Sequence, residues 1–214
     1  MFQSLADVNR SVRLEVSRSL AALAVVHNRL DAFIIELLSL LSKLPYDPLK
    51  YHETGYYGLR LIVEMVGDQL SDETIDAIIN QIPEMEIIQR ENCIRETAGS
   101  VIGALLMHLK GDKMENVMKK YVMYDKVEEE WTIRHFRSVV IRVSLSQAFD
   151  RVTSKKEWVD RIHSNILGYI CSKKEILAVS GIYAAAFLFD GSFERGLLPL
   201  LSIIHAYCKV SFFL

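Results

Sequence analysis

The sequence predicts an all-α protein. Its 214 residues are 50% hydrophobic, and only four prolines and ten glycines interrupt the chain. Apolar residues recur at helical spacing, and sustained strand-like alternation is almost absent. This length and hydrophobic content are enough to bury a sizeable core as one or two domains.

Small or slim residues recur at intervals of 40 to 43 residues. These anchor positions are Val16, Gly58, Ala98, Ser138 and Gly181. An apolar residue follows each anchor after seven positions, which is two helical turns along the same face. These residues are Leu23, Met65, Leu105, Leu145 and Leu188. Self-similarity at a fixed period indicates repeated helical units.

Each first helix is followed by a polar break and a second amphipathic stretch. The breaks contain, in order, HNRLD, GDQLSDE, KGDKMEN, FDRVTSKKE and FDGSFER. The second helices are expected at about 30–44, 72–82, 113–123, 156–170 and 194–208. Ser71 and Asp72 are suited to cap the second of them. The helix pairs are therefore expected at about 9–44, 53–83, 90–123, 131–170 and 175–208.

A period near 40 residues with two helices per unit is typical of HEAT-type or armadillo-type α-solenoids, in which units bury their faces by stacking. We therefore expect one such solenoid of about five helix pairs over residues 1–208. In the run AVSGIYAAAFLF, residues 178–189, Gly181, Ala184 and Ala185 would allow close approach of neighbouring helices. The alternative is a buried helix in a non-repeating bundle.

Composition excludes several classes of protein. The net charge of -2 gives no global field that would attract DNA, RNA or a membrane, so such a partner would need a local patch. The first residues lack a signal peptide, and no uncharged run approaches the ~20 residues of a membrane span. Cys93, Cys171 and Cys208 are odd in number and lie in apolar surroundings, which favours reduced core thiols in a cytoplasmic protein.

Enzyme motifs are absent from the sequence. It contains no glycine-rich phosphate loop, HExxH, paired CxxC or GxSxG. The six histidines are scattered along the chain. We therefore expect no catalytic residue, no cofactor and no metal site. An enzyme of unfamiliar type would instead show a buried cluster of His, Asp and Cys side chains.

One polar cluster is dense: IRHFRSVVIR, residues 133–142. Arg134, His135, Arg137 and Arg142 form a candidate partner-binding site. Guanidinium groups bind phosphate or carboxylate in a bidentate manner, so a ribosomal RNA backbone or an acidic protein patch would fit. Alternatively, Arg134 and Arg137 pair with the acidic run 128–130 or with acids of an adjacent unit and link the repeats.

Four strings carry a resemblance to a known family. SVRLEVSRSLAAL, RETAGSVIGALLMHL, IRHFRSVVIRVSLSQA and ILAVSGIYAAAFLF, in this order and spacing, resemble the C-terminal end of the ribosome-associated activators of the general amino-acid control kinase. The resemblance extends from about Ser11 to about residue 208. Its most specific parts are RHFRS at 134–138, similar to the family's RHGRS, and AVSG at 178–181.

The sequence departs from the family at a few of these positions. Phe136 replaces a typical Gly, Tyr183 replaces an Arg, and Ala184 and Ala186 replace Gly. The missing Arg removes one donor fork that could meet phosphate or carboxylate, which puts binding through that helix in doubt. Packing should survive, because Ala favours helix formation where space permits.

The resemblance implies a non-catalytic scaffold in translational stress signalling. Such activators are giant HEAT-repeat proteins, so this chain would be a fragment of a longer array. Its implied partners are the ribosome and the RWD domain of the kinase that phosphorylates the α subunit of initiation factor two. No kinase-contact residue follows from the motifs. A generic HEAT or armadillo adaptor in transport or chaperoning is the alternative.

The last residues, KVSFFL at 209–214, follow the fifth predicted pair directly. A terminal repeat of a solenoid normally has a polar outer face, which this apolar tail lacks. We interpret Lys209 to Leu214 as a gene-model or intron read-through.

Overall fold

The computed structural model describes residues 4–5, 7–43, 49–84, 90–123 and 130–194. Every regular element in these ranges is helical, which confirms the all-α prediction. The chain divides into two compact units, residues 1–108 and 109–214, which are described separately below.

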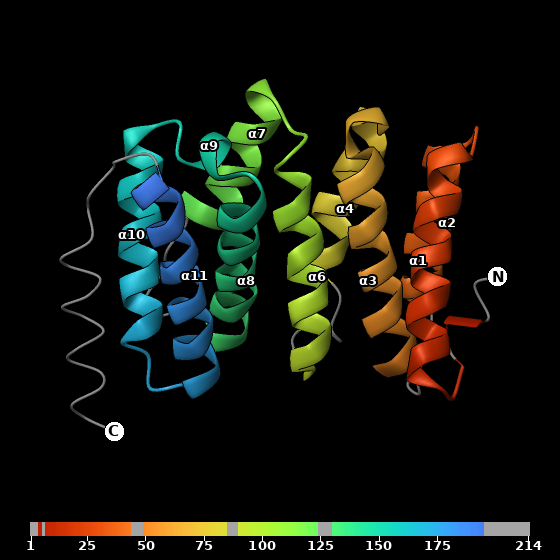
Figure 1. Cartoon of the computed structure of the whole chain (residues 1–214), viewed down its shortest axis with the longest axis horizontal. Coiled ribbons are helices and arrows are strands. Elements are labelled where there is room, and N and C mark those ends of the chain that lie inside the picture. Colours follow the sequence, from red (N-terminus) through yellow and green to blue (C-terminus); the bar gives the residue numbers. More distant parts are fainter. Residues whose placement is uncertain (1–3, 6, 44–48, 85–89, 124–129, 195–214) are drawn as a thin grey trace. The chain divides into compact units, whose positions relative to one another are not determined.

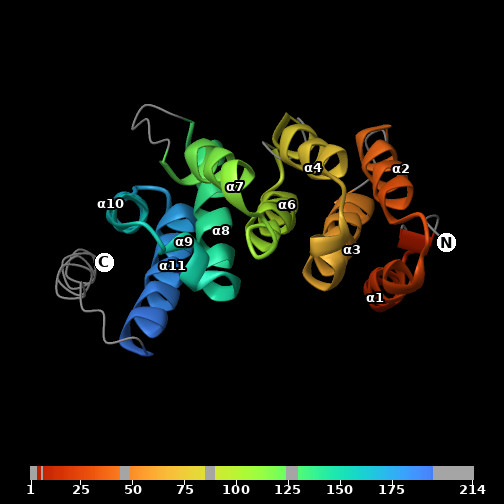
Figure 2. The same cartoon turned by 90° about the horizontal axis from the view of Figure 1, so that it is seen from above.

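The first unit contains two layers of helices (Figures 1 and 2). The first helices pack side by side, α3 lying against both α1 and α6. The second helices, α2 and α4, form the other layer. The elements are α1 (Arg10–Val26), α2 (Leu30–Lys43), α3 (Leu49–Val66), a 3-10 turn η2 (Gly67–Gln69), α4 (Asp72–Glu84) and α6 (Asn92–Leu105). Alternating first and second helices are the architecture of an α-solenoid.

Polar caps fix where two of these helices begin. The Asn9 side chain accepts a hydrogen bond from the backbone N–H of Ser11 at 2.9 Å and starts α1. The Ser71 hydroxyl accepts one from the backbone N–H of Thr74 at 3.3 Å, so the predicted capping role of Ser71 is confirmed. The Asp31 carboxylate accepts hydrogen bonds from the Ser71 N–H and hydroxyl at 2.9 and 3.0 Å and thereby links α2 to α4.

Small residues set the contact between α1 and α3. A Cβ added to Gly58 would lie 3.4 Å from the Ser17 Cβ, and the buried Ser17 hydroxyl donates to the Thr54 carbonyl oxygen at 2.8 Å. Ser17, one residue after the predicted anchor Val16, is therefore the residue of α1 that lies against Gly58. Met65 is 54% exposed and does not join the core, unlike Leu105 of α6.

The second unit repeats the same layering. Its first helices α8 and α11 pack side by side, and α10 packs on α11 and on η3. The elements are α7 (Gly111–Met118), its π-helical continuation η3 (Lys119–Met123), α8 (Trp131–Gln147), α9 (Phe149–Val152), α10 (Lys156–Ile170) and α11 (Glu175–Glu194). This layering supports the predicted solenoid class.

Two predicted breaks differ from the structure. The break at FDRVTSKKE contains a short helix, α9. The prediction of a break at FDGSFER is wrong, because α11 continues through this segment to Glu194. Gly191 lies so close to the Phe149 ring that an added Cβ would be 2.3 Å from it, so this glycine serves helix packing rather than a turn. The rest of the predicted second helix, residues 195–208, lies outside the described residues.

The close approach predicted for Gly181 is confirmed. A Cβ at this position would lie 2.8 Å from the Tyr169 Cβ and 2.9 Å from the Ile170 backbone nitrogen. Ala184 and Ala185 are buried beside it. Because one of the two neighbours is backbone, α10 and α11 can approach this closely only with glycine at position 181.

The prediction of core thiols is wrong for two cysteines. Cys93 and Cys171 are exposed at the ends of helices, and Cys208 lies outside the described residues. Burial, followed by the nearby charge of Glu53, still raises the pKa of the Cys93 thiol. Among the helices that the structure describes, none combines the length and apolar character needed to cross a lipid bilayer.

Candidate functional site

The predicted cationic cluster lies on α8, a helix that is buried along most of its length. His135 is completely buried and Arg137 is only 9% exposed. Both side chains are therefore directed into the structure and offer little surface to a partner. Neither was distinguishable from its exposed neighbours by sequence spacing alone.

Arg134 links α8 to α10. Its Nη2 donates to the Gly168 carbonyl oxygen at 3.4 Å, and its guanidinium carbon lies 5.7 Å from the centroid of the Tyr169 ring. Its Nε is buried without a hydrogen-bond partner among the described residues. This geometry favours a role for Arg134 in linking α8 to α10. The link is made through a carbonyl group and an aromatic ring, and not through the expected acidic residue. Of the acidic run at 128–130, only Glu130 lies in the described part of the chain.

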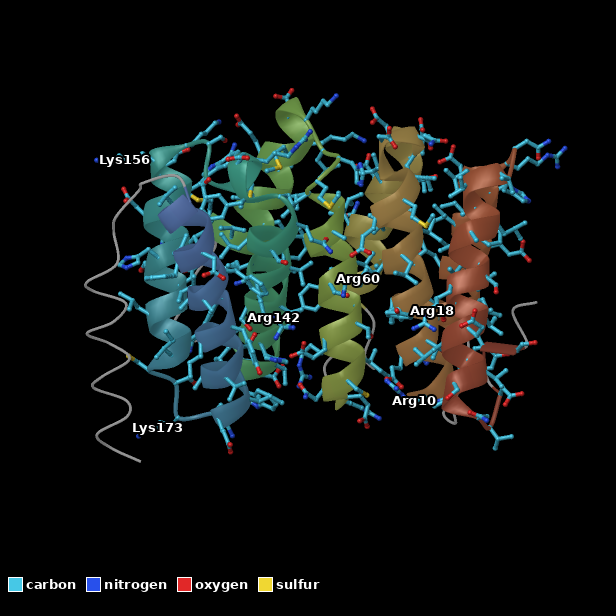
Figure 3. The ribbon with its side chains drawn as sticks, in the orientation of Figure 1. Arg10, Arg18, Arg60, Arg142, Lys156 and Lys173 are labelled. Carbon is cyan, nitrogen blue, oxygen red and sulfur yellow. The ribbon has the colours of Figure 1, made fainter. Side chains whose placement is uncertain are left out.

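Arg142 is the member of the cluster that reaches the edge of an exposed surface. It lies two turns further along α8 than Arg134, is half-buried, and its guanidinium carbon is 5.9 Å from the centroid of the Tyr183 ring. Tyr183 is 54% exposed. Figure 3 shows Arg142 on α8 beside α11, well away from Lys156 and Lys173. A cation over an aromatic ring contributes about 0.5–1 kcal/mol at an exposed site.

A stripe of exposed apolar side chains continues from Tyr183 along α11. Val179, Tyr183 and Phe187 follow one another at a spacing of four residues, which places them on one face of the helix. We call these three residues together with Arg142 the Arg142–Tyr183 surface. In the described part of the second unit, all the exposed large hydrophobic residues belong to α11.

The predicted core packing of residues 178–189 accounts for the inward face of α11 but not for its exposed outward face. The signal was present: α11 is apolar around its whole circumference, whereas a helix covered on one side needs only one apolar stripe. Its buried face combines small residues such as Ala184 with Leu177 and Leu188, and large apolar residues such as Tyr183 and Phe187 are directed outward. The departure from the family at Tyr183 therefore lies in the middle of the exposed stripe.

The composition of the Arg142–Tyr183 surface fits protein binding. Aromatic residues and arginine are enriched in the cores of protein interfaces, where they act as anchors. No group of His, Cys, Asp and Glu able to hold a metal ion occurs among the residues that the structure describes. The Arg142–Tyr183 surface presents one cation and three large side chains of mainly apolar character.

Comparisons with known proteins agree with this architecture. A family described as stalled ribosome sensor GCN1-like HEAT repeats matches residues 32–210. The chain is similar to stalled ribosome sensor GCN1 of Mus musculus, with 25% identity over 209 residues, 96% of this chain and 8% of the relative. It is also similar to stalled ribosome sensor GCN1 of Homo sapiens, with 25% identity over 194 residues, 91% of this chain and 7% of the relative.

The chain thus spans less than a tenth of the length of these relatives. No solved structure matches it.

Proposed function

This chain belongs to the family of stalled ribosome sensor GCN1-like HEAT repeats, and we propose that it is a non-catalytic scaffold in translational stress signalling. In this role it contributes to linking stalled ribosomes to the kinase of the initiation factor two α subunit. The family match and the solenoid fold support the proposal. The proposed location is the cytoplasm.

The observation that carries the proposal is the Arg142–Tyr183 surface. A solenoid that packs its first helices side by side leaves their outer faces for partners. On α11 that face carries Val179, Tyr183 and Phe187, with Arg142 at its edge. We propose that the RWD domain of the kinase docks here, with the apolar stripe as anchor and Arg142 meeting an acidic group of the partner.

The four residues of the predicted site then have two roles. Arg142 contacts the partner. Arg134, His135 and Arg137 hold α8 in place, because they are buried or bound to α10. The mechanism is positional: a scaffold that binds ribosome and kinase together raises the effective concentration of one near the other.

The test is a pull-down of the kinase's RWD domain by the full chain at low and at physiological salt. Arg142→Glu and Tyr183→Ser should each weaken saturable binding, because one removes the cation and the other an anchor ring. Arg18→Glu is the matched control: Arg18 is an exposed arginine on the first helix α1 and pairs with Glu15 at 3.0 Å. Docking on this surface would be excluded if Arg18→Glu weakened binding of the RWD domain as much as Arg142→Glu and Tyr183→Ser do. It would also be excluded if the folded parent chain did not bind the domain.

Ribosome co-sedimentation separates this proposal from a generic HEAT adaptor in transport or chaperoning. The scaffold should sediment with ribosomes in a salt-sensitive manner. A folded chain that never sediments with ribosomes at any salt concentration would favour the adaptor.

A further inference from the structure

The two units carry opposite charge, although the whole chain is close to neutral. Residues 1–108 contain 9 Lys and Arg against 15 Asp and Glu, a formal charge of -6. Residues 109–214 contain 16 against 12, a formal charge of +4. Such asymmetry between halves favours a polyanionic partner for the basic half. The net charge of the whole chain is only -2, because the charges of the two units largely cancel.

Two lysines of the second unit pair with one carboxylate, and a third lysine is adjacent to one of them in the sequence. Lys155 forms an ion pair with Glu115 Oε1, and Lys119 Nζ lies 4.0 Å from Glu115 Oε2. Lys156, adjacent to Lys155 at the start of α10, is exposed and has no ionic partner within the described residues. We call Lys119, Lys155 and Lys156 the Glu115 lysine cluster. Its lysines exceed its acid by two positive charges.

Part of this cluster is preorganised. Lys155 Nζ lies 4.8 Å from the centroid of the Trp158 ring, and Trp158 is only 5% exposed. The ring and Glu115 therefore fix the position of the Lys155 ammonium group from two directions. The hydrogen bond from Lys155, with its charge, lowers the pKa of the Glu115 carboxyl, so this acid stays ionised and keeps both lysines near it.

The surroundings of the cluster lack an apolar anchor. Within the described part of the second unit, the exposed large hydrophobic residues all lie on α11, and none on α7 or α10. A protein partner would need such an anchor at the centre of its interface. Single-stranded RNA would need exposed rings on which bases could stack. A double-stranded RNA backbone needs neither, because phosphates are bound by charge.

We propose that the Glu115 lysine cluster binds the phosphate backbone of double-stranded RNA without regard to base sequence. Lysine suits this task as a compact, mobile point charge. The proposal concerns the second-helix layer and is independent of kinase docking on the Arg142–Tyr183 surface. Either proposal can fail without the other.

The test measures binding of the full chain to a ten-base-pair RNA duplex over a range of salt concentrations. The double variant Lys119→Gln, Lys156→Gln should bind more weakly, and its slope of log K against log salt should be shallower by roughly 2, about one per lost phosphate contact. Lys155 is left unchanged because its side chain also packs on Trp158. Glu115→Gln should bind more tightly, since the competing carboxylate is gone.

Lys173→Gln is the matched control. Lys173 is an exposed lysine beyond the opposite end of α10, and its neighbour Lys174 also lies over a tryptophan ring, that of Trp131 (Figure 3). Lys173→Gln should change the slope of log K against log salt by less than half as much as the double variant does. Circular dichroism and melting temperatures check that all variants are folded.

Four outcomes would overturn the proposal. The first is absence of duplex binding by the folded chain. The second is an equal slope of log K against log salt for the double variant and the parent chain. The third is a Glu115→Gln variant that binds no more tightly than the parent. The fourth is binding of polyglutamate or of vesicles with anionic lipid that equals or exceeds binding of the duplex, which would assign the cluster to an acidic protein or a membrane surface instead.

Discussion

The hydroxyl oxygens of Ser138 on α8 and Ser180 on α11 are hydrogen bonded at 2.8 Å, and the two residues are 42 positions apart in the sequence. Other bonds between elements have similar separations. Ser71 binds Asp31 across 40 residues, and the Asn165 amide donates to the Val122 carbonyl oxygen across 43. The repeat period of the sequence is thus the distance along the chain between bonded positions of successive helix pairs.

Replacing Gly181 tests this close packing directly. Gly181→Ala should destabilise the chain by about 1–3 kcal/mol, because the new Cβ would overlap Tyr169 and the Ile170 backbone. Gly181→Leu should destabilise it further. Chemical denaturation of each variant measures the free energy of unfolding.

Gly168→Ala is the control for Gly181. A Cβ at position 168 would meet only the Arg134 guanidinium at 3.5 Å, an ordinary contact, so the better helix propensity of alanine should leave stability unchanged or raised by up to about 1 kcal/mol. Similar unfolding free energies for the two variants would contradict the close approach of α10 and α11 at Gly181.

Much of this repeat pattern was predictable from sequence, because units that stack on one another must present small residues at equivalent positions. The first unit shows the limit: Ser17 makes the contact expected of Val16, and Met65 is exposed. Adjacent residues differ by about 100° around the axis of a helix, so the 40-residue period does not decide which of two neighbours makes the contact. Periodicity alone therefore places the helix pairs but not each contact.

The candidate site was less predictable. Sequence spacing placed Arg134 and Arg137 on one helical face, but it gave no account of the neighbours that cover that face. It also could not separate the inward side of α11 from the outward side, because both are apolar. Such distinctions depend on the helices that surround α8 and α11.

Asp31 should make stability depend on pH in the acid range. Burial raises the pKa of its carboxyl, but hydrogen bonds from Thr74 and Ser71 outweigh burial and lower it below the ordinary value. The stabilising contribution of a carboxyl with a lowered pKa is present above about pH 4, the ordinary pKa, and is lost as the pH falls through the lower folded-state pKa. Asp31→Asn should cost about 1–2 kcal/mol at pH 7 and flatten this acid dependence.

Glu36→Gln on the same helix is the control, because Glu36 is exposed and has no ion pair among the described residues. Urea denaturation at several pH values from 3 to 7 compares the two variants. An acid dependence in Asp31→Asn equal to that of the parent chain would show that Asp31 does not link α2 to α4 in solution.

Cys93 should react more slowly with iodoacetamide than the cysteine of an unstructured peptide at pH 8. Burial and the charge of Glu53 raise its pKa, which lowers the fraction of reactive thiolate. Glu53→Gln should increase the rate, and Glu15→Gln, which removes an acid on α1, should not. Mass spectrometry of the labelled peptide gives the rate at Cys93 alone; a rate unaffected by Glu53→Gln would be inconsistent with this electrostatic influence.

Charge reversal separates the structural arginine of α8 from the one at the surface. Arg137→Glu should destabilise the chain by about 3–5 kcal/mol, because it places an unmatched negative charge at a buried position. Arg142→Glu should change stability by less than about 1 kcal/mol, since its ring contact with Tyr183 is partly exposed. Thermal melts give the ranking, and partner binding per folded molecule should fall only in Arg142→Glu. If Arg137→Glu instead melted like the parent chain and lost binding, Arg137 would be a contact residue and α8 would have to move to expose it.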